Sequence, residues 1–161
     1  MINGLLMVNI KTEEEKRLYE NYGIIIKSVQ IAAPDVQDHR VDIIGRNGSV
    51  DLTEAVTGNV RYNDRSIDID VRFLGDENQR TSKVSELENF CHGQKMKFIF
   101  DDDKAFYYLG RISNISAPKV VNNKALDFTL SLTVDPYKYN ITSSAEDWLW
   151  DPFDFEESMI N

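Results

Sequence analysis

Apolar and polar residues alternate strictly in two stretches of the chain, residues 66–73 and 126–134. A two-residue period places every second side chain on the same face of a β-strand. The apolar face would carry Ile67, Ile69, Val71 and Phe73 in the first stretch, and Leu126, Phe128, Leu130, Leu132 and Val134 in the second. The pattern therefore predicts two half-buried strands, each with one face toward a hydrophobic core.

Four shorter runs are typical of strands because they are rich in β-branched or aromatic residues. Pro34 follows the first run and cannot donate to a sheet ladder, so we expect a turn after that strand. Polar or glycine-containing segments predict a loop at residues 45–48, a hairpin turn at residues 101–104 and a turn at residues 122–123. The four runs cover residues 24–31, 40–44, 95–100 and 105–112.

The principal helix is predicted between Asp76 and Gly93. Val84, Leu87 and Cys91 recur there at the 3.6-residue period of a helix, while charged residues fall on the other faces. Glycine tolerates the left-handed backbone that commonly closes a helix, so Gly93 is the expected stop.

A second, shorter helix is predicted from Thr12 to Tyr22. Thr12 followed three residues later by Glu15 forms a capping-box pattern, in which each residue satisfies a free backbone N–H of the first helical turn. Gly23 follows at the expected stop.

These elements indicate the α+β class, dominated by β. Several alternating strands with one long helix between them favour an antiparallel β-sandwich or split barrel that carries the helix on one side. We expect one such domain at residues 1–139 and an aromatic, acidic extension at residues 140–161. Residues 148–155 of the extension hold two Trp and two Phe without any period that would bury them. They should dock on this domain or on another chain.

Composition and charge narrow the function classes. A chain of 161 residues with 42% hydrophobic residues is long enough for one core. The formal net charge is −9, which gives no support for a surface that binds phosphate groups, so tight nucleic-acid binding is not expected. The first ten residues are too short an apolar run for a signal peptide or a membrane span, so neither secretion nor membrane contact is expected.

Candidate chemical groups are few. Asp101, Asp102 and Asp103 could hold a divalent ion, but neighbouring side chains on a tight turn splay apart, which favours a solvated turn. His39 and His92 have no metal-ligand spacing with Cys91, and a lone Cys is usually a small buried apolar residue. Because no nucleophile elbow, phosphate loop or dinucleotide fingerprint is present, we assign no catalytic, cofactor or metal residue and expect no enzyme.

A charged strand face is a further candidate surface. Asp68 and Asp70 alternate with the apolar residues of the first stretch. With Arg65 and Arg72 they are expected to form a charged outer face that is either solvated or pairs across strands or across a subunit interface.

Several landmarks, taken in order, resemble the distal tail protein family of long-tailed phages that infect Gram-positive bacteria. The likeness runs from about residue 19 to residue 157, and residues 45–54 carry its most specific part. The landmarks are Tyr22-Gly23-Ile24-Ile25, Pro34, Val41-Asp42-Ile43-Ile44-Gly45-Arg46-Asn47-Gly48-Ser49-Val50-Asp51-Leu52-Thr53-Glu54, Tyr62 with Arg65, Phe90-Cys91-His92-Gly93, Asp101-Asp102-Asp103, Tyr107-Tyr108-Leu109-Gly110-Arg111 and Trp148-Leu149-Trp150-Asp151-Pro152-Phe153.

The resemblance implies a β-sandwich with a helix and a protruding hairpin, copies of which assemble into a hexameric ring. Such a ring joins the major tail tube protein to the tail-tip or baseplate proteins and leaves a channel through which DNA passes without tight binding. The location implied is the tail tip of the virion, after assembly in the cytoplasm of the bacterial host. Ile44-Gly45 stands where the family often has Pro-Gly, which affects only local loop geometry.

The chain stops at Asn161, where many members of that family continue into a lectin-like domain, so attachment to receptors or polysaccharides is not carried over. Two other function classes remain open at this point. One is a carbohydrate-binding module, because exposed Trp and Tyr can stack on sugars. The other is a metal-dependent hydrolase centred on residues 101–103.

Overall fold

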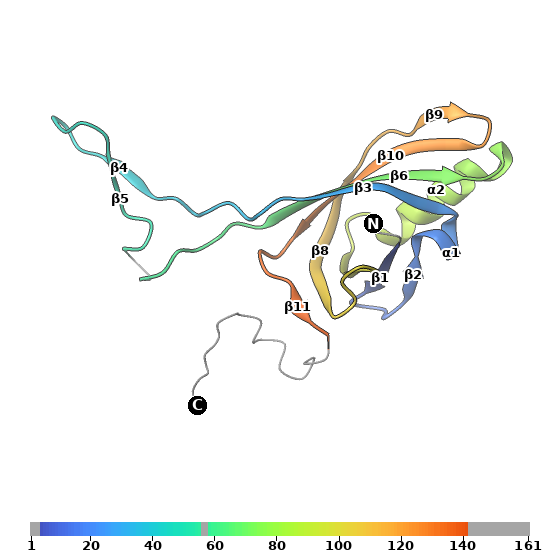
Figure 1. Ribbon diagram of the computed structural model, residues 1–161, viewed down its shortest axis with the longest axis horizontal. Coiled ribbons are helices and arrows are strands. Elements are labelled where there is room, and N and C mark those ends of the chain that lie inside the picture. The colour runs from blue at the N-terminus through green and yellow to red at the C-terminus, as the bar shows by residue number, and fades with distance from the viewer. Residues whose placement is uncertain (1–3, 56–57, 142–161) are drawn as a thin grey trace.

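The computed structural model describes residues 4–55 and 58–141, which form two helices and eleven β-strands (Figure 1). The helices are α1 (Leu18–Tyr22) and α2 (Glu77–Cys91). The strands are β1 (Leu5–Asn9), β2 (Glu15–Arg17), β3 (Ile24–Ile31), β4 (Arg40–Asp42), β5 (Ser49–Asp51), β6 (Arg65–Leu74), β7 (Lys95–Phe100), β8 (Phe106–Ile115), β9 (Lys119–Asn122), β10 (Ala125–Val134) and β11 (Tyr139–Asn140).

One antiparallel sheet makes up most of the fold. Its strands follow the order β2-β1-β7-β8-β10-β6-β3, with β9 added beside β10 and β11 beside β8. The two alternating stretches of the sequence are its central strands, since β10 pairs with β6 over ten consecutive residues, from Ala125 opposite Leu74 to Val134 opposite Arg65. The α+β class, mainly β with one principal helix, is confirmed.

The core lies on the concave side of this sheet. A single cluster of buried residues takes side chains from β1 and β7 near one end of the strand order and from β6 and β3 at the other, so the sheet curls around its own apolar face. All apolar residues of the two alternating stretches belong to this cluster, which confirms their predicted orientation. The helix α2 contributes Val84, Leu87 and Cys91, as its period predicts.

The prediction of a helix from Thr12 to Tyr22 is wrong for the first half of that range. The Asn9 side chain accepts hydrogen bonds from the amides of Lys11 and Thr12, and the Asn9 amide donates to the carbonyl of Glu14. These bonds close a turn between β1 and β2. Glu15 consequently pairs with Val8 in a strand instead of capping a helix. Only residues 18–22 are helical, and they end at Gly23 in the left-handed conformation, as expected.

Other boundaries differ by a few residues. The strand expected at residues 40–44 ends at Asp42, because Ile43 begins the turn that follows. The strand expected at residues 105–112 runs from Phe106 to Ile115. The hairpin between β7 and β8 and the turn between β9 and β10 are confirmed.

The outer face of the sheet carries a polar network. Arg72 donates two hydrogen bonds to Asp127, at 2.7 and 3.0 Å, and Lys27 donates a third at 2.9 Å. The Arg72 guanidinium, aided by Lys27, holds the pKa of Asp127 well below its usual range. Beside this group, Asp70 accepts hydrogen bonds from the hydroxyls of Ser28 and Thr129. The expected pairing across strands is therefore present.

Arg65 does not belong to that face, contrary to the expectation. Arg65 lies on the same face of β6 as Ile67 and Ile69, and its guanidinium lies 5.9 Å from the ring centroid of Tyr108. The two-residue period had already placed Arg65 on the inner side of β6.

The strand assignment of β10 predicts opposite outcomes for two neighbouring substitutions. Leu130 is fully buried, so Leu130→Asp would place an unpaired carboxylate in the core and lower the free energy of unfolding by at least about 3 kcal/mol. Ser131 has the outward parity, so Ser131→Asp should change it by less than about 1 kcal/mol. Thermal unfolding followed by circular dichroism measures both. Similar melting temperatures would contradict the assignment.

Candidate functional site

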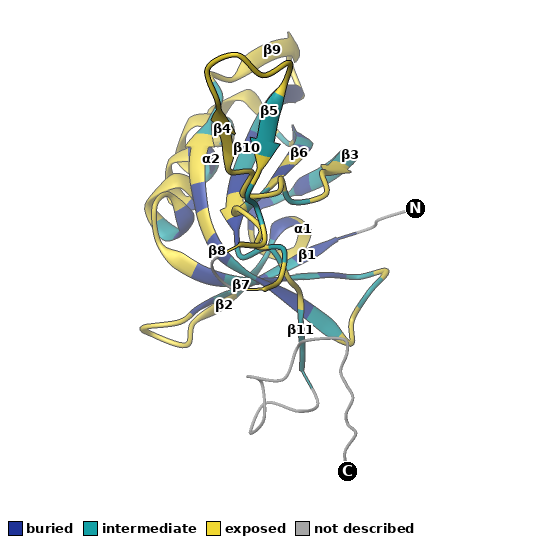
Figure 2. Ribbon diagram, turned by 90° about the vertical axis from the view of Figure 1, so that its left-hand side faces the viewer, coloured by how far each residue is buried: buried dark blue, intermediate teal, exposed yellow. Residues whose placement is uncertain are grey.

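The most unusual feature of the fold is an arm, defined here as residues 32–64, that projects from the sheet (Figure 1). It continues the β3–β6 pair: the Ala32 amide donates to Ser66, Val36 bridges Tyr62, and β4 and β5 form a hairpin at the far end. From residue 25 to residue 66, no residue that the structure describes is buried, and the arm lacks any part of the core (Figure 2).

A polar cluster, which we name the clamp, fastens the hairpin where it meets the rest of the arm. The Thr53 hydroxyl lies 2.9 Å from an oxygen of Asp38 and 2.5 Å from an oxygen of Asp51. It also accepts a hydrogen bond from the His39 amide, at 3.2 Å. Arg40 donates to Asp38 at 2.9 Å and lies 3.7 Å from Asp51. The clamp thus ties the strand before the tip to the strand after it.

The clamp also perturbs a carboxylate. Hydrogen bonds from the hydroxyl and the amide of Thr53, with a smaller contribution from the charge of Arg40, hold the pKa of Asp51 below its ordinary value. Asp51 is therefore ionised, and available to the clamp, throughout the neutral range.

The tip of the hairpin presents apolar side chains to solvent. Gly45 and Gly48 both have positive φ, as the predicted loop requires, and the amide of Arg46 donates to the carbonyl of Ile43. This turn leaves Ile44 fully exposed and Ile43 half exposed. An apolar tip, held by a polar clamp at the end of an arm without a core, is an arrangement suited to docking on another protein surface.

The residues considered for metal chemistry are not brought together. Asp101 is bound by Arg17, and Asp103 lies 2.6 Å from the Lys138 amine, so the two side chains leave the turn in different directions. The turn predicted there is confirmed. Within residues 4–55 and 58–141, no three His, Cys, Asp or Glu side chains form a group that could hold a metal ion.

The remaining candidates are dispersed. Cys91 is fully buried, its thiol donates to the Leu87 carbonyl at 2.9 Å, and burial raises its pKa to about 12, so it is a core residue as predicted. His92 is exposed beside Ile112, and His39 lies on the arm. The aromatic residues expected at 148–155 fall outside the described residues.

Comparison with solved structures shows that this fold resembles the crystal structure of SPP1 Dit (gp 19.1), described as a paradigm of the hub adsorption apparatus in phages that infect Gram-positive bacteria. The TM-score is 0.65 at 18% sequence identity, and the match covers 84% of this chain and 52% of SPP1 Dit. This chain therefore spans about half of that protein. The likeness confirms the Dit-like fold that the resemblance predicted.

No protein-family profile matches the chain, and no curated protein matches its sequence. Neither helix of the described residues is long and apolar enough to cross a bilayer.

The clamp was not foreseen from the sequence. Asp38 and Asp51 lie thirteen positions apart, and no periodicity joins them. The available signal was the run Asp51-Leu52-Thr53-Glu54, which stood out in the resemblance without a physical role. In the structure, this run supplies one of the two carboxylates of the clamp, Asp51, and its hydroxyl, Thr53.

The clamp predicts a pH effect confined to the arm. The pKa of Asp51 in the folded protein lies below the unfolded value of about 3.9. The contribution of ionised Asp51 to the stability of the arm is therefore complete above the unfolded pKa, and it is lost as pH falls through the folded pKa. Thr53→Val removes the hydroxyl and should raise the pKa of Asp51, whereas Ser49→Ala on the same hairpin should not. Carboxyl chemical shifts followed by NMR between pH 2 and pH 6 measure this. Equal midpoints in both variants would refute the clamp.

Proposed function

We propose that this protein is a structural subunit of a phage tail tip, and that its copies join head to tail through the arm into a closed ring. The observation that carries the proposal is the arm itself: a projecting hairpin in which no described residue is buried, ending in a fully exposed Ile44, on a fold similar to that of SPP1 Dit. Such a segment gains little stabilisation from contacts within its own chain, and contacts with a neighbouring molecule explain it best.

The position of the arm allows head-to-tail contacts between copies. It leaves the domain from one end of the long axis, so the surface it offers differs from the surface at the opposite end (Figure 1). Contacts between two different surfaces are heterologous, and they generate a closed ring when the rotation between copies closes. We propose six copies, as the family resemblance implies.

The ring would connect the major tail tube protein on one side with tail-tip or baseplate proteins on the other, and DNA would pass through its centre. Its place is the virion, at the tail tip, after assembly in the bacterial cytoplasm. We propose that the protein has a structural role, in which it positions other tail proteins, that it catalyses no reaction, and that no cofactor takes part. The extension that begins after residue 139 offers a second contact surface in this proposal.

The proposal predicts that the arm is required for self-association. The purified protein should shift from monomers to hexamers as its concentration rises, and negative-stain class averages should show six-fold annuli. A variant in which Asn-Gly replaces residues 39–59 closes the shortened arm with a favoured hairpin turn and should remain monomeric. Sedimentation velocity measures both proteins. Monomers of the unmodified protein at the highest attainable concentration, together with no ring in tail particles, would contradict the proposal.

A ring that transmits DNA should not bind it. Six copies carry a formal charge of about −54, six times −9, whereas non-specific DNA affinity depends on phosphate neutralisation by Lys and Arg. Because salt weakens phosphate contacts, low salt is the most sensitive condition. We expect no change in the fluorescence anisotropy of labelled duplex DNA at micromolar protein and low salt. Micromolar binding that weakens steeply with added salt would reveal a basic lining and refute this prediction.

A further inference from the structure

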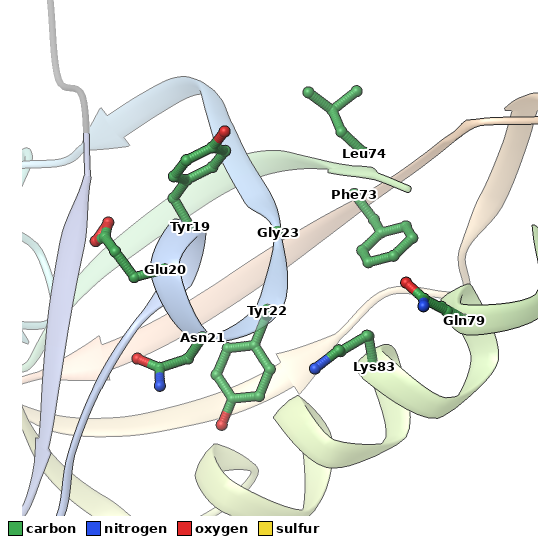
Figure 3. A pocket seen from close by; sticks show the side chains of 9 residues that line it. All are labelled: Tyr19, Glu20, Asn21, Tyr22, Gly23, Phe73, Leu74, Gln79 and Lys83. Atoms are coloured by element: carbon green, nitrogen blue, oxygen red, sulfur yellow. The ribbon is translucent and has the colours of Figure 1, made fainter. Parts of the chain in front are cut away.

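We propose that a hollow beside Gly23 is the acceptor for the arm tip, so that Ile43 and Ile44 of one copy enter the hollow of the next copy. The inference rests on the proposed function and adds to it the receiving surface. That surface is formed by the end of α1, the start of β3 and the end of β6, with α2 alongside (Figure 3).

The hollow has a volume of about 380 Å³, and its lining combines apolar side chains with polar and charged ones. Leu74 and Tyr19 stand on either side of Gly23, and their side chains are 45% and 57% exposed (Figure 3). The buried residues Phe73 and Tyr22 line it further in. Tyr19 and Leu74 therefore leave exposed apolar surface beside the hollow, against which an aliphatic side chain can pack.

Gly23 allows close packing at the edge of the hollow. A Cβ atom at this position would lie 3.2 Å from the Leu74 carbonyl oxygen, and the positive φ of 69° already disfavours any other residue. The glycine that ends α1 therefore also permits the close approach of the Leu74 backbone.

The charges around the tip and around the hollow are complementary. On the arm, Ile43 and Ile44 stand between Asp42 and Arg46, and all four residues are exposed. The hollow has the exposed carboxylate of Glu20 on one side, paired with Arg17 at 3.0 Å, and the amine of Lys83 on the other, 3.8 Å from Glu86 (Figure 3). An inserted tip can therefore add its cation beside Glu20 and its anion beside Lys83.

The two surfaces lie at opposite ends of the molecule. The β4–β5 hairpin forms one extreme of the long axis, and α1 lies toward the other (Figure 1). A tip cannot reach the hollow of its own chain, but it meets the hollow of a copy displaced along this axis. This is the heterologous contact that a ring requires.

Disulfide trapping tests the contact directly. Cys91 is fully buried and does not compete, so paired surface cysteines report proximity between copies. Ile44→Cys protein is mixed with Leu74→Cys protein under mild oxidation, and the matched control mixes Ile44→Cys with Ile10→Cys, a 37% exposed apolar position in the β1–β2 turn. We expect covalent dimers from the first mixture at a rate at least about tenfold above the control, because a disulfide requires Cα atoms within about 7 Å.

A second measurement does not depend on a disulfide. Leu74→Asp should raise the midpoint concentration of self-association at least about tenfold, and Ile10→Asp should leave it within about twofold. Circular dichroism checks that both variants fold.

The outcomes separate the two proposals. If rings form but Leu74 cross-links no faster than Ile10 and Leu74→Asp assembles normally, the acceptor site is wrong and the proposed function stands. If the unmodified protein forms no rings, in solution or in tail particles, both proposals are wrong.

Discussion

The pairing of β6 with its two neighbours is the interaction on which the rest of the structure depends. On one side β6 is bonded to β10 in unbroken register over its whole length, and both strands direct their apolar residues into the core. On the other side it pairs with β3, and the backbone ladder of these two strands continues into the arm. One buried pair of strands therefore anchors a long exposed segment that has no hydrophobic support of its own.

This arrangement divides the physical forces between two regions. In the domain, burial of apolar surface is the dominant stabilising term. In the arm, backbone hydrogen bonds and the clamp replace it, and each such bond contributes only about 0.5–1.5 kcal/mol net. The clamp joins four side chains across the two strands of the arm. The strands therefore do not separate when only one of these bonds opens. The outer network around Asp127 has a related role on the sheet, where it ties β3, β6 and β10 together without any apolar contact.

The sequence predicted the regions in which one period dominates. The strands at residues 66–73 and 126–134 and the helix α2 were identified because core packing imposes a regular spacing on their apolar residues. The prediction was wrong at Thr12, because the Asn9 side chain accepts hydrogen bonds from the amides of Lys11 and Thr12 and closes a turn, after which Glu15 pairs with Val8 in a strand. The hollow beside Gly23 and the clamp could not be predicted, because each brings together residues that are distant in sequence and carry no shared pattern. Arg65 was assigned to the wrong face of the strand, although its spacing of two residues from Ile67 predicts the inner face.

The clamp also determines when the arm becomes ordered. Fixing a residue in a single backbone conformation has an entropic cost of about 1–2 kcal/mol, and for a segment of this length the total is far larger than one surface contact can supply. Because the arm is held in place within its own subunit, that entropy is lost during folding and not during encounter with another molecule. In the proposed ring, association of a preordered arm requires little more than collision in the correct orientation, whereas a segment that folds only on contact loses part of its affinity to its own ordering.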